Sequence, residues 1–204
     1  MEKKREPIKV KAERQLSNKN HREPREEITA SIENGQIKEI WRSRIWEENG
    51  RISSMWGDDR YTPEKSPFEF RTNLYEMLDI WKENKNKEEQ STFVVSISQE
   101  EIEKYFGKYG KPSSFYISER REGYHPRYFY IRILDGKIFD IQETIQFRSR
   151  SETKIITGDK IEKYLTEVIE VLIYKNGKKE YKRFLACLCE EELEKYFEPS
   201  YFPR

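Results

Sequence analysis

Hydrophobic and polar residues alternate along two stretches of the chain, and a turn dipeptide interrupts each stretch. Residues 37–56 carry Asn49-Gly50 between two strand-like runs, and residues 128–147 carry Asp135-Gly136 between two others. Both residues of such a dipeptide tolerate the positive φ angles of a type I′ turn, so Asn-Gly and Asp-Gly are strong hairpin signals. The pattern therefore predicts two antiparallel β-hairpins.

Apolar residues at helical spacing follow each predicted hairpin. Residues 67–84 and 158–177 each place five of them on one stripe, namely Phe70, Leu74, Met77, Leu78 and Trp81, and Ile161, Tyr164, Leu165, Val168 and Leu172. Such spacing predicts amphipathic helices, and Asn176-Gly177 is a good helix stop. Because residues 167–174 are also rich in β-branched side chains, a strand paired across Asn176-Gly177 is the alternative to the second helix.

An internal repeat relates the two halves of the chain. Residues 93–106 align without gaps to residues 184–197, and seven of these 14 positions are identical. The same offset of 91 aligns the two predicted helices that precede them. The turns at Asn49-Gly50 and Asp135-Gly136 lie 86 residues apart, so we expect the link between hairpin and helix to differ by five residues.

The repeat predicts an α+β fold of two related halves, residues 28–110 and 111–204. In each half we expect an antiparallel sheet built on the hairpin, a helix packed on it, and a strand–helix appendage. Residues 1–27 contain nine Lys or Arg against six Glu, almost no large apolar side chains and no periodicity. We therefore expect a mobile basic arm, which either grips nucleic acid or a partner or is a solvated tail.

Composition narrows the class of protein. The 204 residues are 38% charged, 35% hydrophobic and 14% aromatic, with a net charge of +1, a balance that resembles the ion-pair-rich surfaces of thermophile proteins. There is no run of 18 apolar residues and no apolar signal region near the first residue, so we expect neither a membrane span nor a secreted precursor. Cys187 and Cys189 match neither a CxxC nor a zinc spacing. We expect an intracellular, cytoplasmic protein without cofactor or metal.

The strand-like stretches have two chemically different faces. In residues 127–134, Phe129, Ile131 and Ile133 alternate with tyrosine and arginine, and successive side chains of a strand point to opposite faces. One face therefore packs under a helix and the other carries rings and cations. The candidate nucleic-acid-binding residues are Arg127, Tyr128, Tyr130, Arg132 and Arg148, with Arg42, Arg44 and Trp46 on one strand face of the first half.

An open sheet face of this kind suits single-stranded nucleic acid. Exposed rings stack on bases at about 1–3 kcal/mol per base without a required sequence, and arginines neutralise phosphates. We therefore expect non-enzymatic binding of single-stranded DNA or RNA. The alternative is that these rings pack against another subunit or a protein partner. The chain would then be a protein–protein interaction or assembly module, for example a virus-encoded structural or inhibitory protein, or a homodimer.

Residues 114–172 resemble a PUR repeat, the unit of a family of single-strand binders that is structurally akin to the Whirly proteins. The likeness lies in the runs SERREGYHPRYFYIRI, DGKIFDIQE and KIITGDKIEKYL. It covers about 59 of the 204 residues, and in the first half it extends only to the hairpin of residues 41–56. The resemblance implies four antiparallel strands followed by a helix, and binding of single-stranded DNA or RNA on the sheet face.

A nuclease is the third possibility. Asp140 on one predicted strand and Glu152-Thr153-Lys154 near the next resemble the PD-(D/E)xK arrangement, in which two carboxylates hold Mg²⁺ and a lysine aids the attacking water. Acid-x-Lys triplets also occur at four other places, and no proline precedes Asp140. A phosphate-binding glycine loop and a nucleophile elbow are both missing from the sequence. We therefore expect no enzyme activity and no catalytic residues.

Overall fold

The chain forms two compact units, which divide after Gly107. The computed structural model describes residues 6–16, 24–48, 51–120 and 123–197. Each unit contains a four-stranded antiparallel sheet with its strands in sequential order, β1-β2-β3-β4 in the first and β5-β6-β7-β8 in the second. Helices follow the sheet in both units, so the expected α+β fold of two related halves is confirmed.

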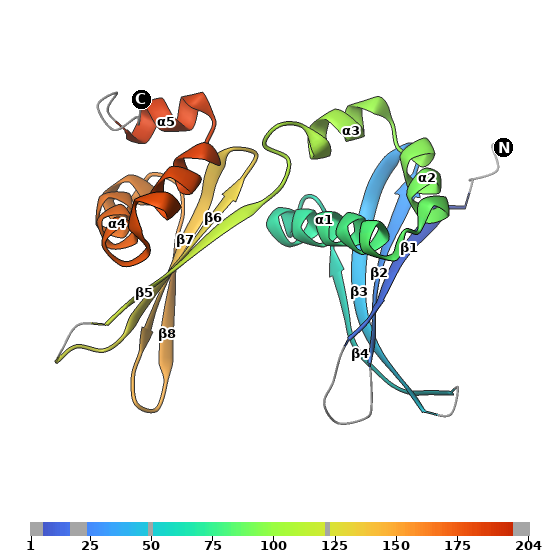
Figure 1. Ribbon diagram of the computed structural model, residues 1–204, viewed down its shortest axis with the longest axis horizontal. Helices are drawn as coiled ribbons and strands as arrows, with labels where there is room; N and C mark the ends of the chain where they lie inside the picture. The colour runs from blue at the N-terminus through green and yellow to red at the C-terminus, as the bar shows by residue number, and fades with distance from the viewer. Residues whose placement is uncertain (1–5, 17–23, 49–50, 121–122, 198–204) are drawn as a thin grey trace. The chain divides into compact units, whose positions relative to one another are not determined.

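The first unit places its helices on one face of its sheet (Figure 1). Its elements are β1 (Ile8–Gln15), β2 (Arg25–Glu33), β3 (Gln36–Glu48), β4 (Arg51–Tyr61), α1 (Pro67–Asn84), α2 (Lys87–Ser96) and α3 (Gln99–Phe106). Alternate residues of the strands meet the apolar stripe of α1 in one core, which includes Ile28, Ile40, Phe70, Leu74 and Trp81. The opposite face of the sheet carries no helix of this unit among the described residues.

The second unit repeats this order. Its elements are β5 (Ser113–Glu119), β6 (Arg127–Leu134), β7 (Lys137–Gln146), β8 (Ser151–Ile156), α4 (Lys160–Ala186) and α5 (Glu190–Tyr196). Gly177, with φ 83° and ψ 170°, interrupts α4, so this helix corresponds to α1 and α2 together. The helical interpretation of residues 167–174 is confirmed, because Val168, Val171 and Leu172 are buried on the sheet.

The turns that correspond in the two units are not the ones that the sequence suggested. Asn34-Gly35 and Asp135-Gly136 join the second and third strands of their units, and all four residues have φ between 51° and 76°. Asn49-Gly50 lies outside the described residues, between β3 and β4, which pair on both sides of it. The expected match of Asn49-Gly50 with Asp135-Gly136 is therefore wrong. A turn dipeptide indicates only that a hairpin turn is favoured locally. Because one unit contains several consecutive hairpins, the dipeptide does not tell which of them corresponds to a hairpin of the other unit.

The appendage after each main helix consists of two helical segments joined by a short non-helical link, residues 97–98 in the first unit and 187–189 in the second. Residues 93–96, expected to begin a strand, belong to α2, which buries Phe93 and leaves Val95 exposed. In the second unit the corresponding Phe184 is fully buried in the last part of α4. One aromatic anchor in the core is enough to hold a short helix here, despite the β propensity of the neighbouring valines.

The first strand corrects the expectation of a mobile basic arm at residues 1–27. β1 pairs with β2 from Ile8 opposite Ile32 to Gln15 opposite Arg25, and Val10 and Ala12 are fully buried. The Trp81 indole on α1 also donates a hydrogen bond to the carbonyl oxygen of Lys11 at 2.7 Å. An edge strand needs only alternate, small apolar residues on its core side, which is why the segment lacked large ones.

No helix in the described part of the chain is long and apolar enough to cross a membrane.

Replacing Val10 tests whether β1 is part of the core. Val10→Ala is expected to lower the free energy of unfolding by roughly 1–3 kcal/mol, because it leaves a cavity beneath α1. Lys9→Ala, on the exposed side of the same strand, should change it by less than about 0.5 kcal/mol. Urea unfolding measures both, and equal stability of the two variants would mean that β1 is dispensable.

Candidate nucleic-acid interface

The second sheet packs against α4 on one face, and no described helix of this unit covers its other face, which carries the predicted tyrosines. Tyr130 lies opposite Tyr116 on β5 and Gln142 on β7, while Tyr128 lies opposite Ser118 and Thr144. The alternating residues Phe129, Ile131 and Ile133 are buried in the core beneath α4. The predicted alternation of β6 is therefore confirmed. We call this surface the tyrosine face, which comprises Tyr116, Tyr128, Tyr130, Gln142, Thr144, Thr153 and Ile155.

Two rings of the tyrosine face are already stacked on each other. The ring centroids of Tyr116 and Tyr128 are 5.9 Å apart, with 20° between the ring planes. The Tyr128 hydroxyl donates to Oε1 of Gln146 at 2.9 Å, which fixes the orientation of this ring. Tyr116 remains 56% exposed and Ile155 on β8 remains 60% exposed. The face therefore presents preoriented aromatic and apolar surface to solvent.

Arg132 shares this side of the sheet, but an ion pair occupies its guanidinium. Its Nε donates to Oδ1 of Asp140 at 2.8 Å and its Nη2 donates to Oδ2 at 2.5 Å. Asp140 is only 2% exposed, and the Arg132 guanidinium also lies over the Phe139 ring, 5.1 Å from its centroid. A buried carboxylate without this partner would be strongly destabilising. Arg132 is therefore tied into the sheet by a structural ion pair.

Arg127 lies on the other face, under α4, and not beside the tyrosines. It donates to Glu143 from Nη2 at 2.7 Å and to Glu167 from Nη1 at 2.7 Å, and its Nη1 is 3.5 Å from Glu119. Partial burial alone would lower the pKa of the Arg127 guanidinium. The hydrogen bonds to Glu167 and Glu143 outweigh it and raise the pKa of the guanidinium above its ordinary value. The expected grouping of Arg127 with Tyr128 and Tyr130 is therefore wrong.

The first-unit candidates also lie on the helix-bearing side of their sheet. Arg42 donates to Glu26 on β2 at 2.7 Å and to Glu76 on α1 at 2.8 Å, and Arg44 donates to Glu26 at 3.4 Å. Trp46 lies two residues after Arg44 on β3 and is half-buried. Burial alone would raise the pKa of Glu26, but the hydrogen bonds from Arg42 and Arg14 lower it below its ordinary value. Arg42 and Arg44 share one face as predicted, and that face holds an ion-pair cluster.

The clusters around Glu26 and Arg127 occupy corresponding positions with inverted charge. Three strands and the main helix each supply one residue, in the first unit Arg14, Glu26, Arg42 and Glu76, and in the second unit Glu119, Arg127, Glu143 and Glu167. Every strand position changes sign, whereas the helix keeps its glutamate. Sequence reasoning missed these partners because each cluster joins four elements.

The uncovered faces of the two sheets carry different side chains at corresponding strand positions. Lys11, Glu27 and Thr29 occupy the positions that correspond to Tyr116, Tyr128 and Tyr130. The Lys11 ammonium forms ion pairs with Glu27 at 3.0 Å and Glu13 at 3.2 Å. The first face is therefore occupied by ion pairs at the positions where the second face carries stacked rings.

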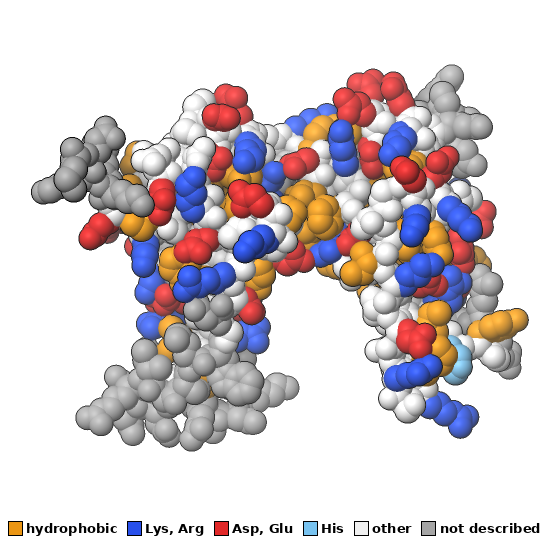
Figure 2. Space-filling view, turned by 180° about the vertical axis from the view of Figure 1, so that it is seen from behind, with side chains coloured by type: hydrophobic (Ala, Val, Ile, Leu, Met, Phe, Trp, Pro, Cys, Tyr) orange, Lys and Arg blue, Asp and Glu red, His pale blue; other side chains and the backbone are white. Residues whose placement is uncertain are grey.

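One end of the second sheet adds an aromatic and basic group that includes Arg148. The rings of His125 and Phe147 lie 4.6 Å apart, and the Arg150 guanidinium lies 5.5 Å from the centroid of Phe147. Arg148 and Arg150 are exposed, and Phe147 donates a backbone hydrogen bond to Arg150 at 2.8 Å. In Figure 2 the pale blue side chain of the described histidine lies beside hydrophobic and basic side chains. Sequence reasoning had selected only Arg148 here.

The nuclease constellation is not assembled. Asp140 lies opposite Arg132, on the uncovered side of the sheet. Glu152 and Lys154 alternate along β8 with the residues of the uncovered side, so they lie on the side that faces α4. The Lys154 ammonium lies over the Tyr164 ring, 4.5 Å from its centroid. Within residues 6–16, 24–48, 51–120 and 123–197, no group of three or more His, Cys, Asp or Glu is placed to hold a metal ion.

No protein family, curated protein or solved structure matches the chain significantly. The resemblance of residues 114–172 to a PUR repeat therefore stays a prediction.

The ion pair of Arg132 can be tested through stability. Arg132→Ala is expected to lower the free energy of unfolding by about 3–5 kcal/mol, because Asp140 would remain buried without its partner. Arg148→Ala, at an exposed position, should change it by less than about 0.5 kcal/mol. Chemical unfolding followed by circular dichroism compares the two. An Arg132→Ala variant as stable as the unmodified protein would show that Asp140 does not need this arginine.

Proposed function

We propose that the tyrosine face of the second unit binds single-stranded nucleic acid. The observation that carries the proposal is the exposed stack of Tyr116 on Tyr128, on a sheet face without a covering helix. Aromatic rings on an open sheet are a general platform for unpaired bases, because every base has a face that can stack. The corresponding positions of the first unit hold charged and hydroxyl side chains, so the second unit supplies the site.

Each part of the face has a chemical role in this proposal. Bases stack on Tyr116, Tyr128 and Tyr130, which neighbour one another across β5 and β6. The amide of Gln142 and the hydroxyl of Thr144 lie in the next strand and supply donors and acceptors for base edges. Arg148 and Arg150, exposed at the end of the sheet, neutralise phosphates of the same strand.

The salt dependence of binding follows from the number of cations that reach phosphate. Arg132 and Arg127 are held by buried or partly buried carboxylates. Among the described residues, Arg150 pairs only with the exposed Glu152, at 2.9 Å, and Arg148 is exposed, so these two arginines are proposed to contact phosphate. Two phosphate contacts to a single strand give a slope of about −1.4 in a plot of log K against log salt concentration. We therefore expect binding dominated by stacking and only moderately sensitive to salt.

A second candidate is a protein–protein interface on the same face. The observation that favours it is the charge balance, since the Arg132–Asp140 pair is internally neutral and the exposed Ile155 adds apolar surface. Interface cores are depleted of charge and enriched in tyrosine. The face would then cover a protein partner or a second copy of the chain.

Tyrosine variants test the nucleic-acid proposal. Tyr116→Ala is expected to raise the Kd for a fluorescein-labelled single-stranded oligonucleotide about 5- to 150-fold, which corresponds to the loss of roughly 1–3 kcal/mol of stacking. Tyr116→Phe keeps the ring and should bind within about two-fold of the unmodified protein. Fluorescence anisotropy measures these constants for single-stranded DNA, double-stranded DNA and RNA at two salt concentrations.

The control for this experiment is Tyr174→Ala, which removes an exposed ring on α4 away from the tyrosine face. It should leave the Kd unchanged. If Tyr116→Ala binds as tightly as the unmodified protein, the tyrosine face is not the nucleic-acid site. If Tyr116→Ala instead dissociates an oligomer in analytical ultracentrifugation, and no oligonucleotide binds, the protein–protein candidate takes its place.

A further inference from the structure

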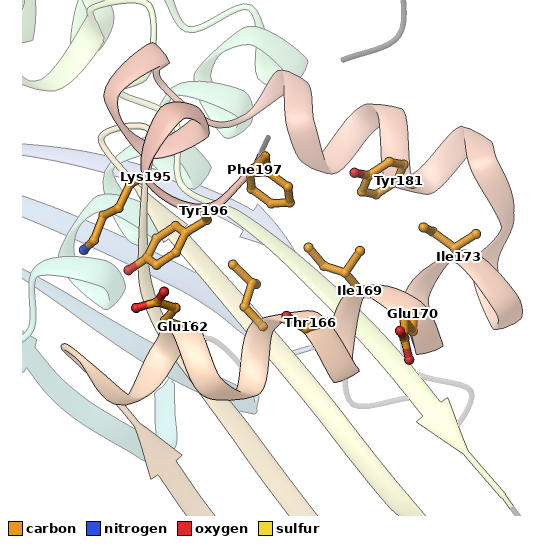
Figure 3. A pocket seen from close by; sticks show the side chains of 10 residues that line it. Glu162, Thr166, Ile169, Glu170, Ile173, Tyr181, Lys195, Tyr196 and Phe197 are labelled. Atoms are coloured by element: carbon orange, nitrogen blue, oxygen red, sulfur yellow. The ribbon is translucent and has the colours of Figure 1, made fainter. Parts of the chain in front are cut away.

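A cavity of about 330 Å³ opens in the second unit between the two parts of α4 and the end of α5 (Figure 3). Leu165, Ile169 and Phe197 contribute apolar surface to it. Figure 3 shows Glu162 of α4 and Tyr196 of α5 together at one end of the cavity. A volume of this size is at the lower end of the range of ligand pockets, so it suits a small molecule with a single ring.

In the first unit, side chains of α1 occupy the corresponding place. At the repeat offset of 91, three pairs of residues correspond: Arg71 and Glu162, Tyr75 and Thr166, and Tyr105 and Tyr196. The Tyr75 hydroxyl donates to the carbonyl oxygen of Tyr105 at 3.0 Å. The Arg71 guanidinium donates to the same oxygen at 3.4 Å and lies 4.6 Å from the centroid of the Tyr105 ring. An aromatic ring and a cation therefore meet at one carbonyl oxygen.

The second unit leaves the place of this aromatic ring to the cavity. The Tyr75 ring of the first unit lies 5.7 Å from the ring of Phe106. In the second unit the corresponding Phe197 lines the cavity, and so does Thr166, whose side chain is too short to replace a phenol ring. A flat apolar group of the size of one ring can therefore lie beside Thr166 and against Phe197.

The end of the cavity at Tyr196 favours a cation. Glu162 places a carboxylate at the helix position where Arg71 places a guanidinium. Among the described lining residues, the carboxylates of Glu162 and Glu170 outnumber the single ammonium, which belongs to Lys195. The half-exposed ring of Tyr196 adds the negative face of a π-system. Carboxylates and an aromatic face both attract a positive charge.

We propose that this cavity binds a small aromatic amine, that is, a single ring that carries a protonated amine on a short chain. The ring of the ligand lies beside Thr166 and against Phe197. Its ammonium lies over the Tyr196 ring, pairs with Glu162 and donates to the carbonyl oxygen of Tyr196. One ligand thereby supplies the ring and the cation that Tyr75 and Arg71 supply in the first unit.

Titrations of the full chain with three probes test the proposal. Benzylamine carries the ring and the cation, benzyl alcohol replaces the ammonium with a neutral hydroxyl group, and benzoate carries an anion. We expect benzylamine to bind about 3- to 30-fold more tightly than benzyl alcohol, the combined effect of one exposed ion pair and one cation–π contact. Benzoate should bind more weakly than benzyl alcohol, because the carboxylates repel it. Isothermal titration calorimetry measures the dissociation constants.

Three variants locate the binding. Glu162→Gln removes the carboxylate and keeps the size of the side chain, so it should weaken benzylamine about two- to five-fold and leave benzyl alcohol unchanged. Glu194→Gln makes the same change of charge at an exposed position of α5 outside the cavity, and should leave both constants unchanged. Thr166→Tyr places the ring of the first unit in the cavity and should abolish the binding of all three probes.

The comparison of benzylamine with benzyl alcohol in Glu162→Gln tests the proposal without Thr166→Tyr, should that variant not fold. Four results would each overturn the proposal. They are no binding of benzylamine, binding of benzylamine no tighter than that of benzyl alcohol, equal losses for both ligands in Glu162→Gln, and undiminished binding to a folded Thr166→Tyr variant.

Discussion

Both units depend on the contact between a hairpin turn and the residue that precedes the last helix. The backbone N–H of Ser98 donates to Gly35 O, and that of Cys189 donates to Gly136 O, both at 2.8 Å. A Cβ at Gly136 would lie 2.9 Å from the Cβ of Cys189, so only glycine permits this approach as well as the positive φ. The carboxylates of Glu101 and Glu192 then accept the N–H of Ile37 and Ile138, at 3.0 and 2.9 Å. This clamp holds the helical layer at one end and on one side of each sheet, which leaves the other side of the sheet open.

The shared framework carries different chemistry on every surface that it leaves free. The core and the clamp are common to both units, whereas the ion-pair cluster inverts its charges, with Arg42 facing Glu26 in one unit and Glu143 facing Arg127 in the other. The open face carries ion pairs in the first unit and tyrosines in the second. Beside the main helix, Tyr75 of the first unit corresponds to Thr166 of the second, which lines a cavity of about 330 Å³. The two units therefore share the contacts that hold the fold and differ in the side chains at corresponding surface positions.

Sequence patterns predicted those strands and helices that can be recognised from a single alternation of apolar and polar side chains or from a single apolar stripe. The alternation of Phe129 and Ile131 with the tyrosines and the stripe on α4 are of this kind. The sequence could not predict β1, because Val10 and Ala12 bury too little apolar area to distinguish an edge strand from a charged tail. The roles of Arg127 and Arg132 were also beyond prediction, since they depend on carboxylates 8 to 40 residues away that only the folded sheet brings to them. The missed Tyr116 had a usable signal, because it alternates with Phe115 and Ile117 on β5.

The asymmetry between the two open faces has a physical consequence for any ligand. On the first face, a base that approached Thr29 would have to displace the ion pairs of Lys11 with Glu27 and Glu13, and the carboxylates would then repel the phosphates. On the second face, the Tyr116–Tyr128 stack holds its geometry without a ligand, and binding requires only the release of water from rings and amides. Little side-chain entropy remains to be lost there, because the Tyr128 hydroxyl is already bonded to Gln146. Among the described residues, the first open face surrounds Trp41, the one ring that neighbours Thr29, with the cations of Lys9 and Lys11 and the carboxylate of Glu27, whereas the second open face groups its rings together. The proposed stacking on an open sheet is therefore expected on the second sheet.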